Sequence, residues 1–209
     1  MKKRTFADPL IFLDIDETIL SFDRPMIDEY NKKYNKQESH EAFRLRENFS
    51  LESYFGLTEE EAQELVKNVF ESDKFLEQPT LILSDYELGT INFYRSQVVF
   101  CSVFPEIYAG RRRESLDRFA PLFPILRCEP GHNKMDVIAE YVGETDKNLF
   151  LIDDNFLHLE KFAQIGTPVM VSHNYNKKYT SAIKLLGGMT VDPQNVIRMI
   201  DYIVNRNRV

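Results

Sequence analysis

Three short apolar runs that end abruptly in a polar side chain constrain this chain more than any other feature. The runs are Leu10–Asp14, Val98–Ser102 and Leu149–Asp153. Continuous apolar runs of this length are typical of strands buried on both faces of a parallel sheet. The carboxyl ends of such strands lie along one edge, where open α/β folds bind their ligands. The sequence therefore predicts that polar groups from distant segments meet at that edge.

Most of the chain alternates between strand-like and helix-like patterns, which predicts an α/β fold. Helices are expected over 86–95, over 114–119, from about 133 and over 156–164, and further strands over 123–126 and 168–171. Such alternation with short connections implies right-handed crossovers between parallel strands. We therefore expect a Rossmann-like parallel sheet that is flanked by helices.

The segment 21–75 departs from this alternation and has the pattern of a small helical bundle. Its clearest helix follows Thr58, which forms a capping-box pattern with Glu61. Apolar residues then recur on one face of this helix up to Phe70. Two earlier, shorter helices are expected in the same segment, over 27–34 and 39–47.

This pattern predicts two units within the 209 residues. Residues 1–20 and 76–209 are expected to form the α/β core. Residues 21–75 are expected to form a helical cap inserted after the first strand.

Composition and charge narrow the classes of partner. With 43% hydrophobic residues the chain can bury a full core. The formal net charge of −7 argues against extended nucleic acid or an anionic membrane as partner, because both would be repelled. No segment approaches the roughly 18 consecutive apolar residues of a membrane-spanning helix, and the first nine residues lack the apolar stretch of an export signal.

The two cysteines fit a reducing compartment. Cys101 lies inside an apolar run, where a buried thiol is expected rather than a disulfide or a nucleophile. We expect a soluble, cytoplasmic protein. The oligomeric state is left open, and a homodimer is one alternative.

Asp14 and Asp16 follow the first strand two residues apart. Both carboxylates can reach one cavity only if the chain turns immediately after Asp14. One carboxylate could then attack phosphorus to form an aspartyl phosphate, while the other protonates the leaving alkoxide and later activates water. Attack by a carboxylate on an anionic phosphate requires a divalent cation and a fixed ammonium to offset the repulsion.

The other fragments supply those charges. Asp153 and Asp154 offer carboxylates for a hard ion such as Mg²⁺, which prefers oxygen ligands. Lys134 supplies the ammonium, and the Ser102 hydroxyl can donate to a phosphate oxygen. Each fragment alone is a weak signal, whereas the ordered set describes one phosphoryl-transfer site.

This ordered set resembles the motif series of the haloacid dehalogenase-like phosphatase superfamily. The resemblance implies that Asp14 is the nucleophile and Asp16 the acid/base. It implies that Ser102 and Lys134 bind the substrate phosphate.

The same resemblance implies a Mg²⁺ cofactor. The ion would be bound by the Asp14 carboxylate, the main-chain carbonyl of Asp16 and the acidic pair. Within that pair it implies that Asp154 is the direct ligand, with Asp153 as its hydrogen-bonding or water-mediated neighbour.

The helical cap and the segments 75–79, 151–154 and 169–174 are similar to cytosolic 5′(3′)-deoxyribonucleotidases, which implies a nucleoside monophosphate substrate. Asp14–Leu20 also resembles small protein phosphatases, but these generally lack a large helical insertion here. A protein or polynucleotide-end phosphatase therefore stays an alternative, as does another small phosphorylated metabolite as substrate. The last alternative is a regulatory module that binds phosphate but is catalytically silent, although the acidic residues of every motif are present.

Aromatic and basic residues could contribute to the substrate pocket. For the cap aromatics we expect burial in the bundle ahead of base stacking. These residues are Phe22, Tyr30, Tyr34, Phe43, Phe49, Tyr54 and Phe55. For Arg44, Arg46 and Arg111–Arg113 we expect solvated surface positions ahead of contact with an anionic group.

Overall fold

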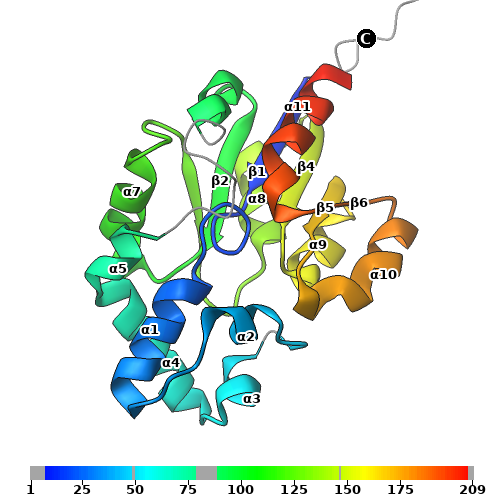
Figure 1. The fold of residues 1–209 in the computed structure, drawn as a ribbon. Coiled ribbons are helices and arrows are strands. Elements are labelled where there is room, and N and C mark those ends of the chain that lie inside the picture. The colour runs from blue at the N-terminus through cyan, green and yellow to red at the C-terminus, as the bar shows by residue number, and fades with distance from the viewer. Residues whose placement is uncertain (1–7, 49, 79–88, 146, 207–209) are drawn as a thin grey trace, which may run out of the picture.

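A computed structural model describes residues 8–48, 50–78, 89–145 and 147–206. Its centre is a six-stranded sheet of order β3-β2-β1-β4-β5-β6 (Figure 1). The strands are β1 Pro9–Leu13, β2 Val98–Val103, β3 Ile125–Cys128, β4 Asn148–Asp153, β5 Thr167–Val171 and β6 Met189–Val191. All five neighbouring pairs are parallel. The predicted fold class, a Rossmann-like parallel sheet flanked by helices, is confirmed.

The strand order reverses at β1, which pairs with β2 on one side and β4 on the other. Leu13 is in register with Phe100 of β2 and with Ile152 of β4. The residue after Leu13 therefore lies beside the ends of both neighbouring strands. Open α/β sheets bind ligands at this type of switch point.

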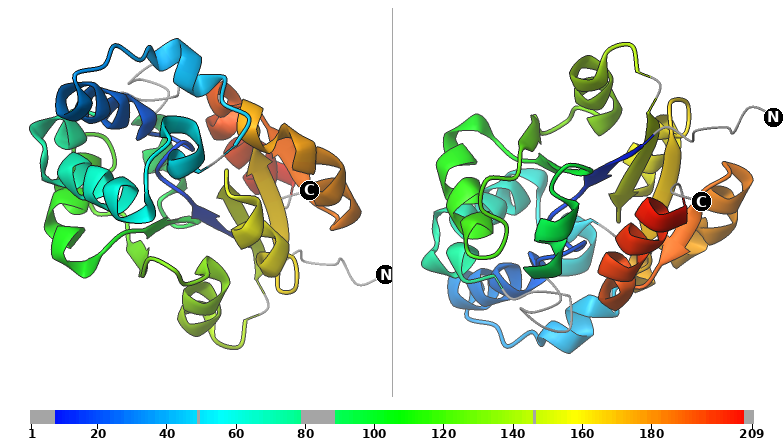
Figure 2. Two further views of the ribbon diagram at one scale, coloured as in Figure 1. Left: turned by 90° about the horizontal axis from the view of Figure 1, so that it is seen from below. Right: turned by 90° about the horizontal axis from the view of Figure 1, so that it is seen from above.

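Two apolar layers cover the sheet, and side chains of β1 alternate between them. Ile11 and Leu13 belong to one layer with α11 Val196–Arg206, whereas Leu10 and Phe12 belong to the other. The second layer contains side chains from α8 Lys134–Val142, α9 Phe156–Phe162 and α10 Thr180–Leu185. Figure 2 shows α8 and α11 on opposite sides of the sheet. A period of two with apolar residues on both faces is expected for a buried parallel strand.

In the described part of the chain, five α-helices come between β1 and the 3-10 helix that precedes β2, and we call these helices and the described residues that flank and join them the helical insert. The helices are α1 Asp23–Tyr34, α2 His40–Arg44, α3 Leu51–Phe55, α4 Glu59–Glu71 and α5 Asp73–Leu76. The insert packs beyond one end of the sheet (Figure 1) and has its own apolar cluster, which includes Phe70 and Phe75. The predicted capping box is present, since Thr58 N donates to Glu61 at 2.8 Å and Glu61 N donates to Thr58 at 3.2 Å.

Several elements differ from the sequence-based expectations. The helix expected over 114–119 begins five residues earlier in the structure, as α7 Ala109–Asp117. The sequence pattern did not indicate this start because a buried arginine occupies an inward-facing position of the helix, where an apolar residue is usual. Within the stretch 86–95, residues 86–88 lie outside the described part, and a 3-10 helix spans Thr90–Tyr94. The short helices α3 and α5, strand β6 and helix α11 were not predicted. Among the described residues, no helix has both the length and the apolar character needed to cross a membrane.

Candidate active site

The predicted site residues line one cavity of about 610 Å³ between the sheet edge and the helical insert. The lining includes Asp14, Asp16, Ser102, Lys134, Asp153 and Asp154. Asp14 follows β1, Ser102 is in the last part of β2, and Asp153 ends β4. The strand register brings these three positions together. The insert closes the other side, with Phe22 and Met26 among its lining residues.

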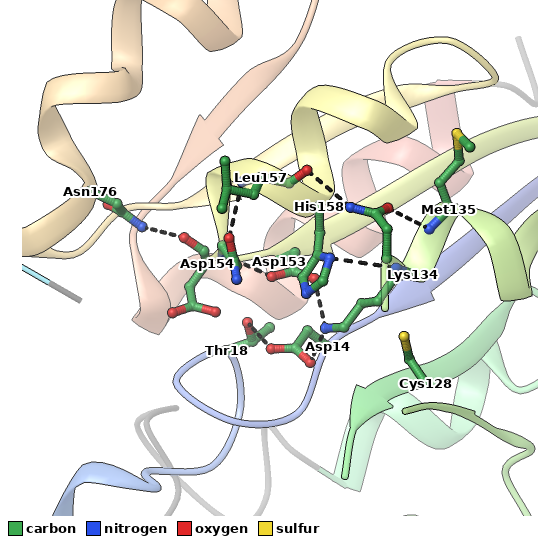
Figure 3. A network of polar contacts seen from close by, with 12 residues as sticks. Asp14, Thr18, Cys128, Lys134, Met135, Asp153, Asp154, Leu157, His158 and Asn176 are labelled. Atoms are coloured by element: carbon green, nitrogen blue, oxygen red, sulfur yellow. Dashed lines mark hydrogen bonds and ion pairs between the residues drawn. The ribbon is translucent and has the colours of Figure 1, made fainter. Parts of the chain in front are cut away.

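Lys134 places its ammonium between two carboxylates (Figure 3). It is the first residue of α8, whose N-cap Asn133 accepts a 2.9 Å hydrogen bond from Met135 N. The Lys134 Nζ contacts Asp14 Oδ1 and lies 2.7 Å from Asp153 Oδ2. Burial disfavours the ammonium, but the two carboxylates prevail and raise the pKa of Lys134 above its usual range. Lys134 is therefore a permanent positive charge in the site.

The Asp14 side chain also accepts a 3.4 Å hydrogen bond from Thr18 Oγ1 through its Oδ2. Burial raises the pKa of Asp14 to about 7, and the ammonium of Lys134 offsets part of this effect. The nearby carboxylates of Asp153 and Asp16 raise it further. One lysine thus does not neutralise the negative charge gathered around Asp14.

This excess of negative charge suits a cation. One carboxylate oxygen from each of Asp14, Asp153 and Asp154 lies within 4.8 Å of the other two, and all three residues are buried. Burial, and then the charges of Asp153 and Asp14, raise the pKa of Asp154 well above its usual value. The donor set consists of carboxylate oxygens, which fits a hard divalent ion.

The acidic pair has two different environments. Asp153 uses both oxygens within the protein, accepting from Lys134 Nζ and, at 2.8 Å, from Asn155 N. Asp154 Oδ2 accepts a 2.6 Å hydrogen bond from the Tyr175 hydroxyl, and no partner is seen for Oδ1 within the described ranges. Asp154 therefore has more free acceptor capacity toward a cation than Asp153.

The chain turns sharply after Asp14, as the sequence required. The amides of Ile19 and Leu20 both donate to the carbonyl of Ile15, at 3.0 and 2.9 Å. Glu17 has a φ of 54° in this turn, a left-handed conformation that is uncommon for residues with a Cβ. The buried Glu17 side chain accepts a 2.8 Å hydrogen bond from Asp23 N, which ties the turn to the start of α1. The Asp16 side chain lines the same cavity, close enough for its charge to raise the pKa of Asp14.

Two arginines that were expected at the surface are buried instead, so those predictions were wrong. Arg46 forms two hydrogen bonds with Asp23, at 2.5 and 3.0 Å, and its guanidinium lies 4.5 Å from the Tyr175 ring centre. Arg112 is 0% exposed and is paired with Asp16. Each guanidinium is paired with an acid that is distant in sequence and also lies against aromatic rings. A run of arginines gives no signal of such pairing.

Sequence analysis also missed the residues that orient the site. Besides Thr18 and Tyr175, His158 accepts a 3.4 Å hydrogen bond from Lys134 N through Nδ1. Asn176 Nδ2 donates to the Asp154 carbonyl at 2.8 Å. Thr18 follows Asp14 by four residues and His158 follows Asp154 by four, so both are close to the motifs in sequence. Tyr175 and Asn176 are 21 and 22 residues from Asp154, and no local pattern connects them with it.

No model of a known protein family matches the chain, and no curated protein matches it either. Solved structures do resemble it. A candidate phosphatase from Clostridium difficile has a TM-score of 0.64 and 13% sequence identity, over 94% of this chain and 99% of that one. A hydrolase of the haloacid dehalogenase (HAD) family from Deinococcus radiodurans, with bound phosphate and sodium, has a TM-score of 0.59 and 9% identity, over 96% and 97% of the two chains.

A third similar structure is a haloacid dehalogenase-like family hydrolase from Xanthomonas campestris. It has a TM-score of 0.54 and 11% identity, over 97% of this chain and 99% of that one. At these identities the likeness shows the fold. The chain has the fold of haloacid dehalogenase-superfamily hydrolases and phosphatases along nearly its full length.

Proposed function

We propose that the protein is a cation-dependent phosphomonoesterase that works through an aspartyl-phosphate intermediate. The observation that carries this proposal is the position of Asp14. Its carboxylate lies at a sheet edge in a cavity, beside the ammonium of Lys134 and within 4.8 Å of two other carboxylates. A nucleophile, a fixed positive charge and a cation-binding oxygen set are thus combined in one place. These are the components that attack on a phosphate monoester requires.

The reaction has two steps. An Asp14 carboxylate oxygen attacks phosphorus, the bond from phosphorus to the ester oxygen breaks, and protonated Asp16 gives its proton to that oxygen. Asp16, now ionised, then takes a proton from a water molecule that attacks the phosphorus. The bond from phosphorus to Asp14 breaks, which releases inorganic phosphate and regenerates both carboxyl groups.

Lys134 and Ser102 have supporting roles in this scheme. The Lys134 ammonium balances the charge on Asp14 and on the transferred phosphoryl oxygens. The Ser102 hydroxyl, on a residue that is 1% exposed and lines the cavity, can donate to one of those oxygens. Asp14, Asp154 and the carbonyl of Asp16 would hold Mg²⁺, with Asp153 beside them. The bound ion would shield the negative charge of the phosphate from the attacking carboxylate.

The cavity wall supplied by the insert favours a small substrate with an apolar part. Four apolar side chains line it, namely Phe22, Met26, Leu51 and Val66. The other cap aromatics in the described ranges pack on one another, as in the stacked pairs Tyr30–Phe55 and Phe43–Phe55. Phe22 also packs against Phe70, with 5.4 Å between the ring centres, but among the described cap aromatics it is the one that lines the cavity. It is therefore the best-placed ring for stacking on a nucleobase. We infer a nucleoside monophosphate as the preferred substrate, ahead of phosphopeptides, which need an open site.

A panel of substrates tests the proposal. Purified protein with Mg²⁺ is assayed for phosphate release from nucleoside monophosphates, sugar phosphates, a phosphopeptide and p-nitrophenyl phosphate. We expect the highest kcat/KM for a nucleoside monophosphate and loss of turnover with excess EDTA. Hydrolysis of the phosphopeptide alone would overturn the substrate assignment. Absence of hydrolysis across the panel would overturn the enzymatic function and favour a silent phosphate-binding module.

A further inference from the structure

Arg112 is among the largest fully buried side chains of the described chain. It belongs to α7, and its guanidinium lies among three phenylalanine rings. The distances from Cζ to the ring centres are 4.7 Å for Phe75 and 5.8 Å for both Phe70 and Phe104. Removal of a permanent charge from water is costly unless partners satisfy it. The burial of a guanidinium among aromatic rings therefore requires an explanation.

The hydrogen bonds of Arg112 provide this explanation. Its Nη2 donates to Asp16 Oδ2, whereas its Nε and Nη1 are buried with no hydrogen-bond partner in the described structure. A guanidinium that served packing alone would be expected to use its remaining donors, or to be replaced by an apolar side chain at less cost. Asp16 is the carboxylate to which this buried charge is directed.

Asp16 is held on its other oxygen as well. Gln78 Nε2 approaches Asp16 Oδ1 at 3.4 Å and the carbonyl of Ser21 at 3.3 Å. The Asp16 side chain remains 24% exposed and lines the cavity. Arg112 thus binds one oxygen of the carboxylate and Gln78 binds the other, while the exposed part of the side chain faces the cavity.

The helical insert takes part in this arrangement. Phe70 and Phe75, which enclose the guanidinium, belong to α4 and α5. Arg111, beside Arg112 on α7, donates a 2.5 Å hydrogen bond to the carbonyl of Ser72 between those two helices. Arg112 therefore lies where the insert, α7 and the turn after β1 meet.

We propose that Arg112 is the positioning residue for Asp16, and this inference rests on the proposed function. A general acid must lie within hydrogen-bond reach of the oxygen that it protonates, about 2.6–3.2 Å. Arg112 fixes the Asp16 carboxylate at the cavity wall, so that its free face meets the ester oxygen of a substrate bound at Asp14. Without Arg112 the carboxylate samples other rotamers, and proton delivery to the leaving group is lost.

Leaving-group dependence tests this inference. An alkyl phosphate such as glycerol 2-phosphate needs a proton on its leaving oxygen, whereas 2,4-dinitrophenyl phosphate releases a stable phenolate without one. We expect Arg112→Met to lower kcat/KM for glycerol 2-phosphate by about 100-fold or more, the usual contribution of general acid catalysis. For 2,4-dinitrophenyl phosphate, kcat/KM should change only slightly. The value of kcat/KM reports the steps up to phosphoryl transfer to Asp14 and does not include the later hydrolysis of the aspartyl phosphate.

Two further variants calibrate the result. Asp16→Asn should show the same selective loss, because it removes the proton donor itself. Arg113→Met is the matched control, since Arg113 is the next residue on α7 and bonds to Asp117 and to the Phe123 carbonyl. It should lower stability without changing the ratio of kcat/KM between the two substrates.

An equal loss of kcat/KM for both substrates in folded Arg112→Met, or no loss, would overturn the inference. If this variant does not fold, Arg112→Lys replaces it, because it keeps the charge but loses the guanidinium geometry. A smaller shift of the ratio in the same direction is expected, and an unchanged ratio would overturn the inference. Failure of the unaltered protein to hydrolyse these two esters and the nucleoside monophosphates would instead refute the proposed function.

Discussion

The hydroxyl of Tyr175 donates a 2.6 Å hydrogen bond to Oδ2 of Asp154. Both residues are buried, and the Arg46 guanidinium of the insert lies 4.5 Å from the ring centre of Tyr175. The contact orients the carboxylate that we propose as a direct cation ligand. It also connects that carboxylate with the insert, because Arg46 is held in turn by Asp23.

Tyr175→Phe should weaken cation binding without unfolding the protein. Loss of a hydrogen bond that orients a metal ligand typically reduces metal affinity by about 10–100-fold. We expect the Mg²⁺ concentration for half-maximal activity to rise by about tenfold, with maximal activity largely recovered at saturation. Tyr179→Phe is the control, because the described contacts of that ring are a stack with Phe156 and a lysine. Equal Mg²⁺ requirements in both variants would contradict the proposed role of Tyr175.

Asp14→Asn should abolish turnover and leave the fold intact. The amide is nearly the same size as the carboxyl group but cannot form the aspartyl phosphate. The loss should exceed about 1000-fold, as is common when a nucleophile is removed. Phosphate release measures activity, and thermal unfolding checks that the variant is folded. Near-normal activity would exclude Asp14 as the nucleophile.

Stabilisation by Mg²⁺ should increase with pH. The pKa of Asp14 is raised to about 7, mainly by burial, from an unfolded value near 3.9. The folded, cation-free protein therefore binds this proton more tightly, and the associated stability is present at low pH and lost as pH rises through about 7. Mg²⁺ competes with that proton. The increase in Tm on adding Mg²⁺ should be larger at pH 8 than at pH 5.5, and equal shifts would contradict the assignment.

Arg46→Met should destabilise the protein through the acid that it leaves behind. Asp23 and Arg46 form a buried pair, and removal of one partner from such a pair typically costs about 3–5 kcal/mol. The double variant Arg46→Met/Asp23→Asn should recover part of this loss, which urea unfolding can measure. Arg44→Met, at an exposed position on α2, should change the free energy of unfolding by less than about 0.5 kcal/mol. Equal stability of the single and double variants would contradict this interpretation.

The sequence indicated the elements whose signals are local. The apolar runs before Asp14 and Asp153 predicted two strands, which pair with each other in the sheet, and the capping box at Thr58 located the start of α4. By contrast, β6 has only three residues and was missed. The start of α7 was misplaced because buried Arg112 reads as a polar position. The division into a core and a cap at residues 21–75 stays a prediction.

The sequence by itself determined which side chains end the buried strands, because polarity patterns along the chain are local. It thereby identified the group around Asp14 and Lys134. Only the tertiary structure decided what surrounds that group. The contact of Arg112 with Asp16 spans 96 residues of sequence, and that of Tyr175 with Asp154 spans 21. Such pairs form because folding buries charged and polar groups that must then be satisfied by whatever lies nearest in space.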